Sequence, residues 1–282
     1  MGIDADLPVK ALRAVVLAAG KGTRLQTEDD DAPKVMRQAR GKPLLRYVLD
    51  ALSFMKEEDI TIVVGYKKDE IIDRFQGYSF AVQAEQLGTG HAVMAASQAL
   101  SSFEGSVLVC YGDMPVVRRD TYEALVEEHF ARGNDCTILT GEAAAVRGQP
   151  DAVQGQPEDV RGQPAADRGQ PEADLPYGRV IRDSNGDFLC VVEDRDCTPE
   201  QRAIRELNSG VYVFRAQPLM EALKMLKNDN TQNEYYLTDV PAILREGGAA
   251  VGLLKRDLGD EMIGVNTLAQ LAQVERILGK EE

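Results

Sequence analysis

The chain has 282 residues, a formal net charge of −14 and a pI of about 4.7, and 44% of its residues are hydrophobic. This length allows one large α/β domain, and the hydrophobic content is sufficient for a core. The acidic balance argues against binding to nucleic acid or to an anionic membrane surface, because either partner would require a basic patch.

The first predicted element is a buried strand over residues 13–17 (RAVVL), followed by the loop of LAAGKGTR. Gly20 and Gly22 permit a tight turn whose backbone N–H groups attract phosphate oxygens. Lys21, Arg24 and, further on, Lys34 add positive charge. The spacing fits neither GxGxxG nor GxxxxGK[ST], so the loop is neither a dinucleotide fingerprint nor a P-loop. It predicts a site for a nucleoside triphosphate, with a ligand-free turn as the alternative.

Strand-like and helix-like segments then alternate. Apolar patterns predict helices over residues 43–55, 68–75, 92–100 and 119–132, and strands over residues 60–64, 106–111 and 136–139. This order predicts a mostly parallel sheet covered by helices. Functional sites in such sheets gather at the carboxyl ends of the strands, where the glycine loop and Asp113 both fall.

The second half of the chain has a different pattern of predicted elements. Residues 178–181, 188–192 and 210–214 read as strands with little helix between them, which predicts an antiparallel extension. Helices are expected again over residues 218–226, 236–245 and 268–278.

A tandem repeat separates the two halves. The units RGQPDAV, QGQPEDV, RGQPAAD and RGQPEAD follow one another with a seven-residue period. Gly and Pro in each unit exclude a coiled coil, and the lack of large apolar residues predicts a disordered loop. A tether that binds another protein is the alternative. We expect one domain over residues 1–282 that carries this insertion at residues 143–176.

The cysteines, at positions 110, 136, 190 and 197, form no CxxC pair, and histidine occurs only at positions 91 and 129. A zinc site is therefore not expected, and reduced thiols are typical of the cytosol. No signal peptide or run of transmembrane length is present in this sequence. We expect a soluble, cytoplasmic protein without a membrane partner.

Asp113, in YGDMP, ends a predicted strand. A single carboxylate with waters and substrate phosphates is a common way to hold magnesium, although a turn or helix cap is the alternative. Asn266, in GVNT, is an oxygen ligand of the right type, but sequence alone does not pair the two residues.

The pairing of Asp113 with Asn266 rests instead on a family resemblance. Ten motifs carry this resemblance: LAAGKGTR, APKV, GKPLL, QAEQLGTGHA, YGDMP, YGRV, VVEDRDCTPEQR, ELNSGVYVF, EYYLTD and GVNT. In these motifs and their order the chain resembles the nucleotidyltransferase (pyrophosphorylase) domain of bacterial N-acetylglucosamine-1-phosphate uridyltransferases. The resemblance implies a Rossmann-like α/β fold with a mixed, mostly parallel sheet, helices on both faces and a small antiparallel extension.

The resemblance also assigns roles to individual residues. It implies catalytic roles for Arg24, Lys34 and Asp113, and Mg²⁺ binding by Asp113 and Asn266. It implies that substrate is bound by Leu17, Ala18, Ala19, Gly20, Gln83, Gly88, Thr89, Tyr111, Gly112, Gly178, Glu193, Asn208 and Asn266. Taken singly, several have simpler interpretations: Gln83 as an exposed strand residue, Glu193 as a solvated carboxylate and Asn208 as a turn residue. His91, in TGHA, reads as a helix-start residue rather than a general base.

The expected reaction is Mg²⁺-dependent transfer of a uridylyl group from UTP to N-acetylglucosamine 1-phosphate, giving UDP-N-acetylglucosamine, a cell-envelope precursor, and pyrophosphate. Another sugar 1-phosphate or nucleotide is one alternative, and a non-catalytic nucleotide-sugar sensor is another. The linker between Arg24 and Lys34 is longer and more acidic than is usual for the family. No β-helix follows GVNT, so we expect no acetyltransferase half and a monomer or weak oligomer; a separate acetyltransferase chain as partner stays open.

Overall fold

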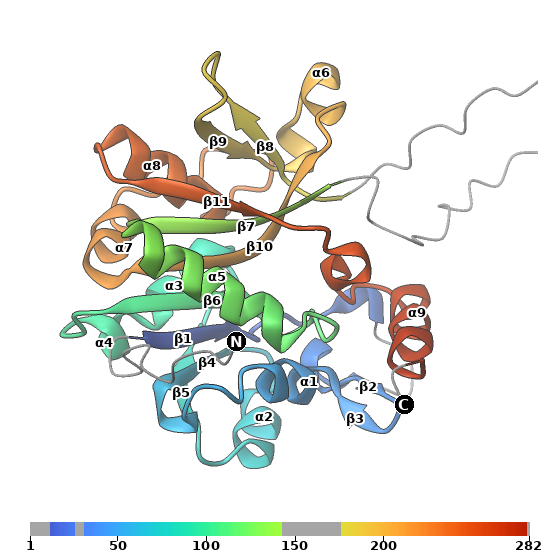
Figure 1. Ribbon diagram of the computed structural model, residues 1–282. Helices are drawn as coiled ribbons and strands as arrows, with labels where there is room; N and C mark the ends of the chain where they lie inside the picture. The colour runs from blue at the N-terminus through green and yellow to red at the C-terminus, as the bar shows by residue number, and fades with distance from the viewer. Residues whose placement is uncertain (1–11, 26–30, 143–175, 281–282) are drawn as a thin grey trace, which may run out of the picture.

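The computed structural model describes residues 12–25, 31–142 and 176–280, and Figure 1 shows how their elements are arranged. The main sheet that these residues form has nine strands: β1 (Leu12–Leu17), β4 (Ile60–Val64), β5 (Ser79–Val82), β6 (Ser106–Tyr111), β7 (Cys136–Glu142), β8 (Arg179–Arg182), β9 (Phe188–Val192), β10 (Glu206–Arg215) and β11 (Val251–Lys255). A separate hairpin pairs β2 (Gln38–Ala39) with β3 (Lys42–Pro43).

Helices flank this sheet. The α-helices of the described residues are α1 (Leu44–Ala51), α2 (Lys68–Arg74), α3 (Thr89–Ala95), α4 (Ser97–Leu100), α5 (Arg119–Arg132), α6 (Pro199–Arg202), α7 (Ala216–Leu223), α8 (Val240–Glu246) and α9 (Leu268–Leu278). Short 3₁₀ helices are η2 (Thr23–Leu25), η3 (Lys34–Met36), η4 (Glu57–Asp59), η6 (Asp194–Asp196), η7 (Leu237–Asp239) and η8 (Gly259–Met262).

The strand order in the sheet is β11-β7-β10-β6-β1-β4-β5. Neighbours are parallel except at β10, which runs antiparallel to both β6 and β7. The antiparallel pair β8–β9 attaches to β10 and projects from the sheet together with α6 (Figure 1). The predicted fold class, a mixed and mostly parallel sheet with a small antiparallel extension, is therefore confirmed.

Both faces of the central strands are buried, because successive side chains of a strand point to opposite faces. Ala14 and Val16 of β1 belong to one apolar cluster, which includes residues of α1 and α5. Val15 and Leu17 belong to a second cluster, which includes residues of α3, α7 and α8. This double burial explains why β1, β4 and β6 read as continuous apolar runs.

Several predicted elements have different limits in the structure. The helix expected over residues 92–100 begins earlier, at Thr89, and is divided at Ala96 into α3 and α4. The helix expected over residues 43–55 ends at Ala51. β7 continues to Glu142, and β10 begins at Glu206 rather than at residue 210. The earlier start of β10 matters for function, because it places Asn208 inside a strand.

The C-terminal helix returns to the N-terminal part of the fold. α9 contacts β2 and lies beside the β2–β3 hairpin in Figure 1. The backbone N–H of Arg40 donates to Glu275 Oε1 at 3.2 Å. Ala39, Val265 and Val274 share a small apolar cluster under this helix. The packing of α9 therefore fixes the segment that carries Asn266.

Two sequence features fall largely outside this structure. Of the predicted insertion at residues 143–176, only Pro176 lies within the described residues, and residues 26–30 of the acidic linker lie outside them. In the parts of the chain that the structure describes, every helix is too short or too polar to span a bilayer.

Candidate functional site

A cavity of about 560 Å³ opens at the carboxyl ends of β1 and β6. Its lining joins residues that the sequence analysis assigned to three different tasks: nucleotide, sugar and cation binding. The predicted residues that line it are Leu17, Ala18, Ala19, Gly20, Arg24, Lys34, Gln83, Gly88, Thr89, Tyr111, Asp113, Gly178, Glu193, Asn208 and Asn266.

Gly112, which was also predicted to bind substrate, is not among the residues that line this cavity. Its backbone N–H donates to Leu17 O at 2.9 Å. A Cβ atom at Gly112 would lie 3.2 Å from side-chain carbons of Leu45 and Val35. Gly112 therefore lies in the contact between β1 and β6 behind the cavity, where a larger residue would press on α1 and η3, and a substrate contact by Gly112 stays a prediction.

The glycine loop follows β1 directly. The backbone N–H of Ala18 still donates to Val63 O, at 2.9 Å, so the loop leaves the sheet at a fixed point. A Cβ atom added at Gly20 would meet no other atom within 4 Å, which leaves the backbone there accessible to a ligand. Gly22 has φ +67°, and a Cβ there would lie 2.7 Å from Lys34 Cβ. Glycine at position 22 thus allows the loop to approach Lys34.

Lys34 brings together the two residues predicted to hold a cation. It opens η3, and its Nζ forms an ion pair with Asp113 Oδ2 and donates to Asn266 Oδ1 at 2.6 Å. The side chains of Lys34 and Asp113 are only 16% and 15% exposed. The backbone also links the two elements, because Val265 N–H donates to Asp113 O at 2.9 Å. A carboxylate and an amide oxygen therefore converge on one positive charge.

The side of the cavity formed by Gln83 and Gly88 is tightly packed. Gln83 is 4% exposed, so its interpretation as an exposed strand residue is wrong. Its Nε2 donates to Gly88 O at 3.0 Å and lies 3.2 Å from His91 Nδ1. Gly88 has φ +105°, and a Cβ there would lie 2.6 Å from Tyr235 O. His91 occupies the first turn of α3, as the helix-start interpretation expects.

Asn208 lines the same cavity. This side chain is 6% exposed inside β10, at a register irregularity between Asn208 and Tyr212. Asn208 Nδ2 donates to the Tyr212 hydroxyl at 2.7 Å, and its Oδ1 accepts from Gly210 N–H at 3.2 Å. The interpretation of Asn208 as a turn residue is therefore wrong: the bond to Gly210 resembles an Asx turn but lies within a strand.

Glu193 directly follows β9, at the start of η6, and it also lines the cavity. Its Oε1 accepts a hydrogen bond from Thr238 Oγ1 at 2.8 Å. Burial raises the pKa of the Glu193 carboxyl, and the bond from Thr238 acts in the opposite direction. The interpretation of Glu193 as a simply solvated carboxylate is thus wrong. Burial, followed by the charge of Glu193, also raises the pKa of Tyr111.

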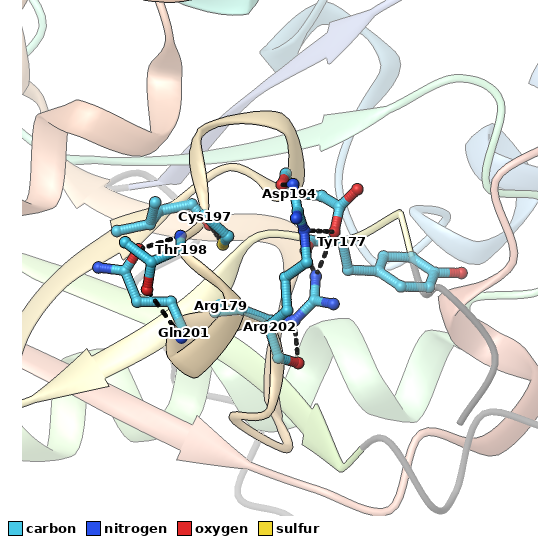
Figure 2. Close-up of polar contacts among 8 residues, drawn as sticks. Tyr177, Arg179, Asp194, Cys197, Thr198, Gln201 and Arg202 are labelled. Atoms are coloured by element: carbon cyan, nitrogen blue, oxygen red, sulfur yellow. Dashed lines mark hydrogen bonds and ion pairs between the residues drawn. The ribbon is translucent and has the colours of Figure 1, made fainter. Parts of the chain in front are cut away.

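A buried arginine contacts Asp194, the residue that follows Glu193 in the chain, and Figure 2 shows its polar contacts. Arg179, which is 4% exposed, lies 3.2 Å through Nη1 from Asp194 Oδ1 and donates to Tyr177 O. Its Nε donates to Arg202 O at 3.4 Å, and Arg202 Nη2 donates to Asp194 O at 3.1 Å. These contacts join β8, η6 and α6, and so fix the turn that presents Glu193 and Arg195 to the cavity.

Sequence reasoning did not identify Arg179 or Thr238. The one local signal for Arg179 was a basic residue in a largely apolar run, YGRVI. Thr238 lies in EYYLTD, a motif that carried the family resemblance without a role for any single residue. Other lining residues that were not predicted include Gln232, Glu234 and Gln270.

The two oxygen atoms that contact Lys34 Nζ, from Asp113 and Asn266, suit a hard cation such as Mg²⁺ better than zinc. Among the described residues, no group of three or more His, Cys, Asp or Glu side chains is placed to hold a metal ion. Asp113 and Asn266 instead offer one carboxylate and one amide oxygen, which is the type of partial shell that Mg²⁺ completes with waters and substrate phosphates.

Comparisons with known proteins identify the family of this chain. Residues 14–233 match the family described as "MobA-like NTP transferase domain". The chain is 41% identical over 265 residues to bifunctional protein GlmU of Lactobacillus delbrueckii subsp. bulgaricus, covering 94% of this chain and 51% of that protein. It is 38% identical over 270 residues to the protein of the same name from Pelotomaculum thermopropionicum, covering 95% and 52%. The chain thus spans about half the length of the curated relatives it matches. These matches confirm the resemblance found in the motifs.

Proposed function

The chain belongs to the MobA-like NTP transferase family, as a nucleotidyltransferase domain of the GlmU type, and we propose that it transfers a uridylyl group from UTP to N-acetylglucosamine 1-phosphate. The products are UDP-N-acetylglucosamine and pyrophosphate. The observation that carries this proposal is the cavity at the carboxyl ends of β1 and β6, which joins the glycine loop, the Lys34–Asp113–Asn266 cluster and the Glu193–Asn208 wall.

In the proposed reaction, a phosphate oxygen of the sugar 1-phosphate attacks the α-phosphorus of UTP, and the bond to pyrophosphate breaks. The nucleophile is already an anion at neutral pH, so the site needs no general base. Catalysis then depends on orientation and on stabilisation of negative charge. Arg24 and Lys34 supply positive charge at the cavity, and the backbone N–H groups of the loop at Gly20 bind phosphate oxygens.

Asp113 and Asn266 are the residues that would hold Mg²⁺. Their oxygen atoms already surround the ammonium of Lys34, which supports their fitness to bind a cation. When bound, the metal ion supplies neutralisation of charge on the phosphates. Lys34 acts on the same region of the cavity, because its ammonium reaches both oxygen ligands from η3.

We assign recognition of the two substrates to two different groups of lining residues. Gln83, Gly88 and Thr89 face the uracil, because the amide oxygen of Gln83 can accept from the imide N–H while the bond from its Nε2 to Gly88 O holds the amide in place. Gly178, Glu193 and Asn208 face the sugar, to which carboxylate and amide groups offer hydrogen bonds. The burial of Gln83 and Asn208 supports selectivity, since a buried polar group left unpaired by the wrong ligand costs binding energy.

Pyrophosphate release tests this function. The purified chain would be assayed with UTP, CTP, dTTP, ATP and GTP, each with N-acetylglucosamine 1-phosphate or glucose 1-phosphate, with Mg²⁺ or with EDTA. We expect the highest kcat/KM for UTP with the acetamido sugar, loss of turnover in EDTA and recovery when Mg²⁺ is added in excess.

Each alternative has its own outcome in the same panel. A higher kcat/KM for another pair would replace the proposed substrates. Absence of release with every pair, together with binding of UDP-N-acetylglucosamine by calorimetry, would support a sensing module. Undiminished turnover in EDTA would contradict the role given to Asp113 and Asn266.

The relatives are called bifunctional, and this chain matches about half of the length of each one. We therefore propose that the described residues form a single nucleotidyltransferase unit, interrupted by the insertion at residues 143–176. A separate chain that supplies an acetyltransferase activity is part of the same proposal, and co-purification with such a chain from its native cells would support it.

A further inference from the structure

One short segment contacts both sides of the cavity. Its backbone at Tyr235 accepts a hydrogen bond from Gly90 N–H at 2.7 Å, and Leu237 N–H donates to Thr89 Oγ1 at 3.0 Å. The next residue, Thr238, points the other way and donates from Oγ1 to Glu193 Oε1 at 2.8 Å. Residues 235–238 thus join the side assigned to uracil to the side assigned to the sugar.

The bond between Thr238 and Glu193 has a defined direction and little contact with solvent. Thr238 lies in η7, is 3% exposed and lines the cavity. An ionised carboxylate can only accept, so the hydroxyl is the donor. Both partners are held by secondary structure, Thr238 within η7 and Glu193 between β9 and η6. The bond therefore fixes the rotation of the carboxyl group.

The surroundings of Glu193 make this donor important. Burial is the largest factor that raises the pKa of Glu193, and the neighbouring carboxylates Asp239, Asp196 and Asp194 raise it further. The hydrogen bond from Thr238 favours the ionised form. One oxygen of the carboxylate is thereby engaged, and its other lone pairs remain directed to accept from a ligand hydroxyl or amide.

We propose that Thr238 is a positioning residue for the sugar 1-phosphate: its hydroxyl orients Glu193 so that the carboxylate accepts hydrogen bonds from the sugar. This inference rests on the proposed function, which assigns Glu193 to the sugar. Leu237 contacts Thr89 through its backbone, so a change of the side chain at position 238 leaves that contact in place.

The test compares two variants at position 238 with one matched control. Thr238→Val keeps the shape of the side chain and removes the donor, whereas Thr238→Ser keeps the hydroxyl. Thr121→Val is the control, because Thr121 is 0% exposed in α5 and its hydroxyl has no hydrogen-bond partner among the described residues. KM and kcat are measured for each substrate by pyrophosphate release, with thermal unfolding as the check on folding.

We expect Thr238→Val to raise the KM for N-acetylglucosamine 1-phosphate about tenfold, the size of effect that follows from loss of one hydrogen bond to a charged group. The KM for UTP should stay unchanged, Thr238→Ser should restore the wild-type KM for the sugar, and Thr121→Val should match wild type. If the wild type is active and Thr238→Val has an unchanged KM for the sugar 1-phosphate, the inference about Thr238 is overturned while the proposed function stands. Equal increases in both KM values, or no recovery with Thr238→Ser, would overturn it in the same way. An inactive wild type would instead refute the proposed function.

Discussion

Lys34 Nζ donates a hydrogen bond of 2.6 Å to Asn266 Oδ1, although 232 positions separate the two residues in the chain. The same ammonium forms an ion pair with Asp113. The three side chains come from η3, from the end of β6 and from the segment before α9. Lys34 therefore neutralises Asp113 in this conformation, and a change in any of the three should affect the other two.

Asp113→Ala should lower kcat by about 100-fold to 1,000-fold, as expected when one preorganised electrostatic group is lost from a transition state. The fold should persist, because Asp113 is a side chain at the cavity and its backbone bond to Val265 remains possible in the variant. Pyrophosphate release and thermal unfolding would be measured together. Asp50→Ala is the control: Asp50 forms ion pairs with Lys42 and Arg46 at the surface, and its loss should leave kcat unchanged. Near-normal turnover of Asp113→Ala would disprove its catalytic role.

Arg24→Ala should also reduce kcat by about two orders of magnitude, because Arg24 supplies cavity charge from η2. Arg24→Lys should recover only part of this loss, since an ammonium cannot contact a phosphate through two parallel N–H groups. Arg132→Ala, which removes a 70% exposed arginine paired with Glu128, is the matched control for loss of one positive charge. Equal activity of the Arg24 and Arg132 variants would exclude a role for Arg24 in turnover.

Gly22→Ala should impair turnover through Lys34. Alanine at this position carries a backbone penalty of roughly 1–2 kcal/mol for positive φ, and its Cβ would lie 2.7 Å from Lys34 Cβ. Gly133→Ala separates the two effects, because Gly133 has nearly the same φ, +65°, and no atom within 4 Å of the added Cβ. We expect both variants to lose thermal stability, Gly22→Ala at least as much as Gly133→Ala, but a fall in kcat/KM only for Gly22→Ala. Equal kcat/KM for the two variants would show that contact with Lys34 has no effect on catalysis.

His129 should make the stability of the fold depend on pH. Its side chain is 1% exposed, and its ring nitrogens lie 3.0 Å from Ser106 Oγ and 3.0 Å from Thr137 Oγ1. Burial, followed by repulsion from Arg215, lowers the pKa of His129 from 6.5 to about 4. As the pH falls, His129 therefore takes up a proton in the unfolded chain at a higher pH than in the folded protein.

The resulting contribution to the free energy of unfolding is complete above pH 6.5 and is lost as the pH falls towards 4. The total loss is up to about 3 kcal/mol for a shift of this size. Urea unfolding of wild type and His129→Gln at a series of pH values would isolate the effect, because carboxylates titrate in both proteins. Parallel curves for the two proteins from pH 7 to pH 4 would contradict it.

The strands buried on both faces could be predicted well from sequence. Residues 60–64 and 106–111 have the predicted limits in the structure, because a continuous apolar run admits few other arrangements. β5 and β11 were not predicted, since they are only partly buried and their sequences, SFAV and VGLLK, lack a clear period. β10 was predicted too short because Ser209 and Gly210, which form an irregularity inside it, resemble a turn.

The site was predictable where its residues are adjacent in sequence and unpredictable where tertiary contacts define it. The glycine loop could be located from its strand and its cations alone. The proximity of Asp113 and Asn266 could be predicted only through a family resemblance, because no local sequence pattern relates the two positions. Arg179 and Thr238 act through residues 15 and 45 positions away, Asp194 and Glu193, so their roles emerge only in the folded chain.

The docking of α9 against the β2–β3 hairpin has a consequence for synthesis of the protein. A ribosome makes Lys34 early and Asn266 more than two hundred residues later. Most of the sheet can assemble while translation continues, but the cluster of Lys34, Asp113 and Asn266 has to wait until the segment before α9 has left the exit tunnel. The cation cluster of the proposed site is therefore completed later than the glycine loop and Asp113.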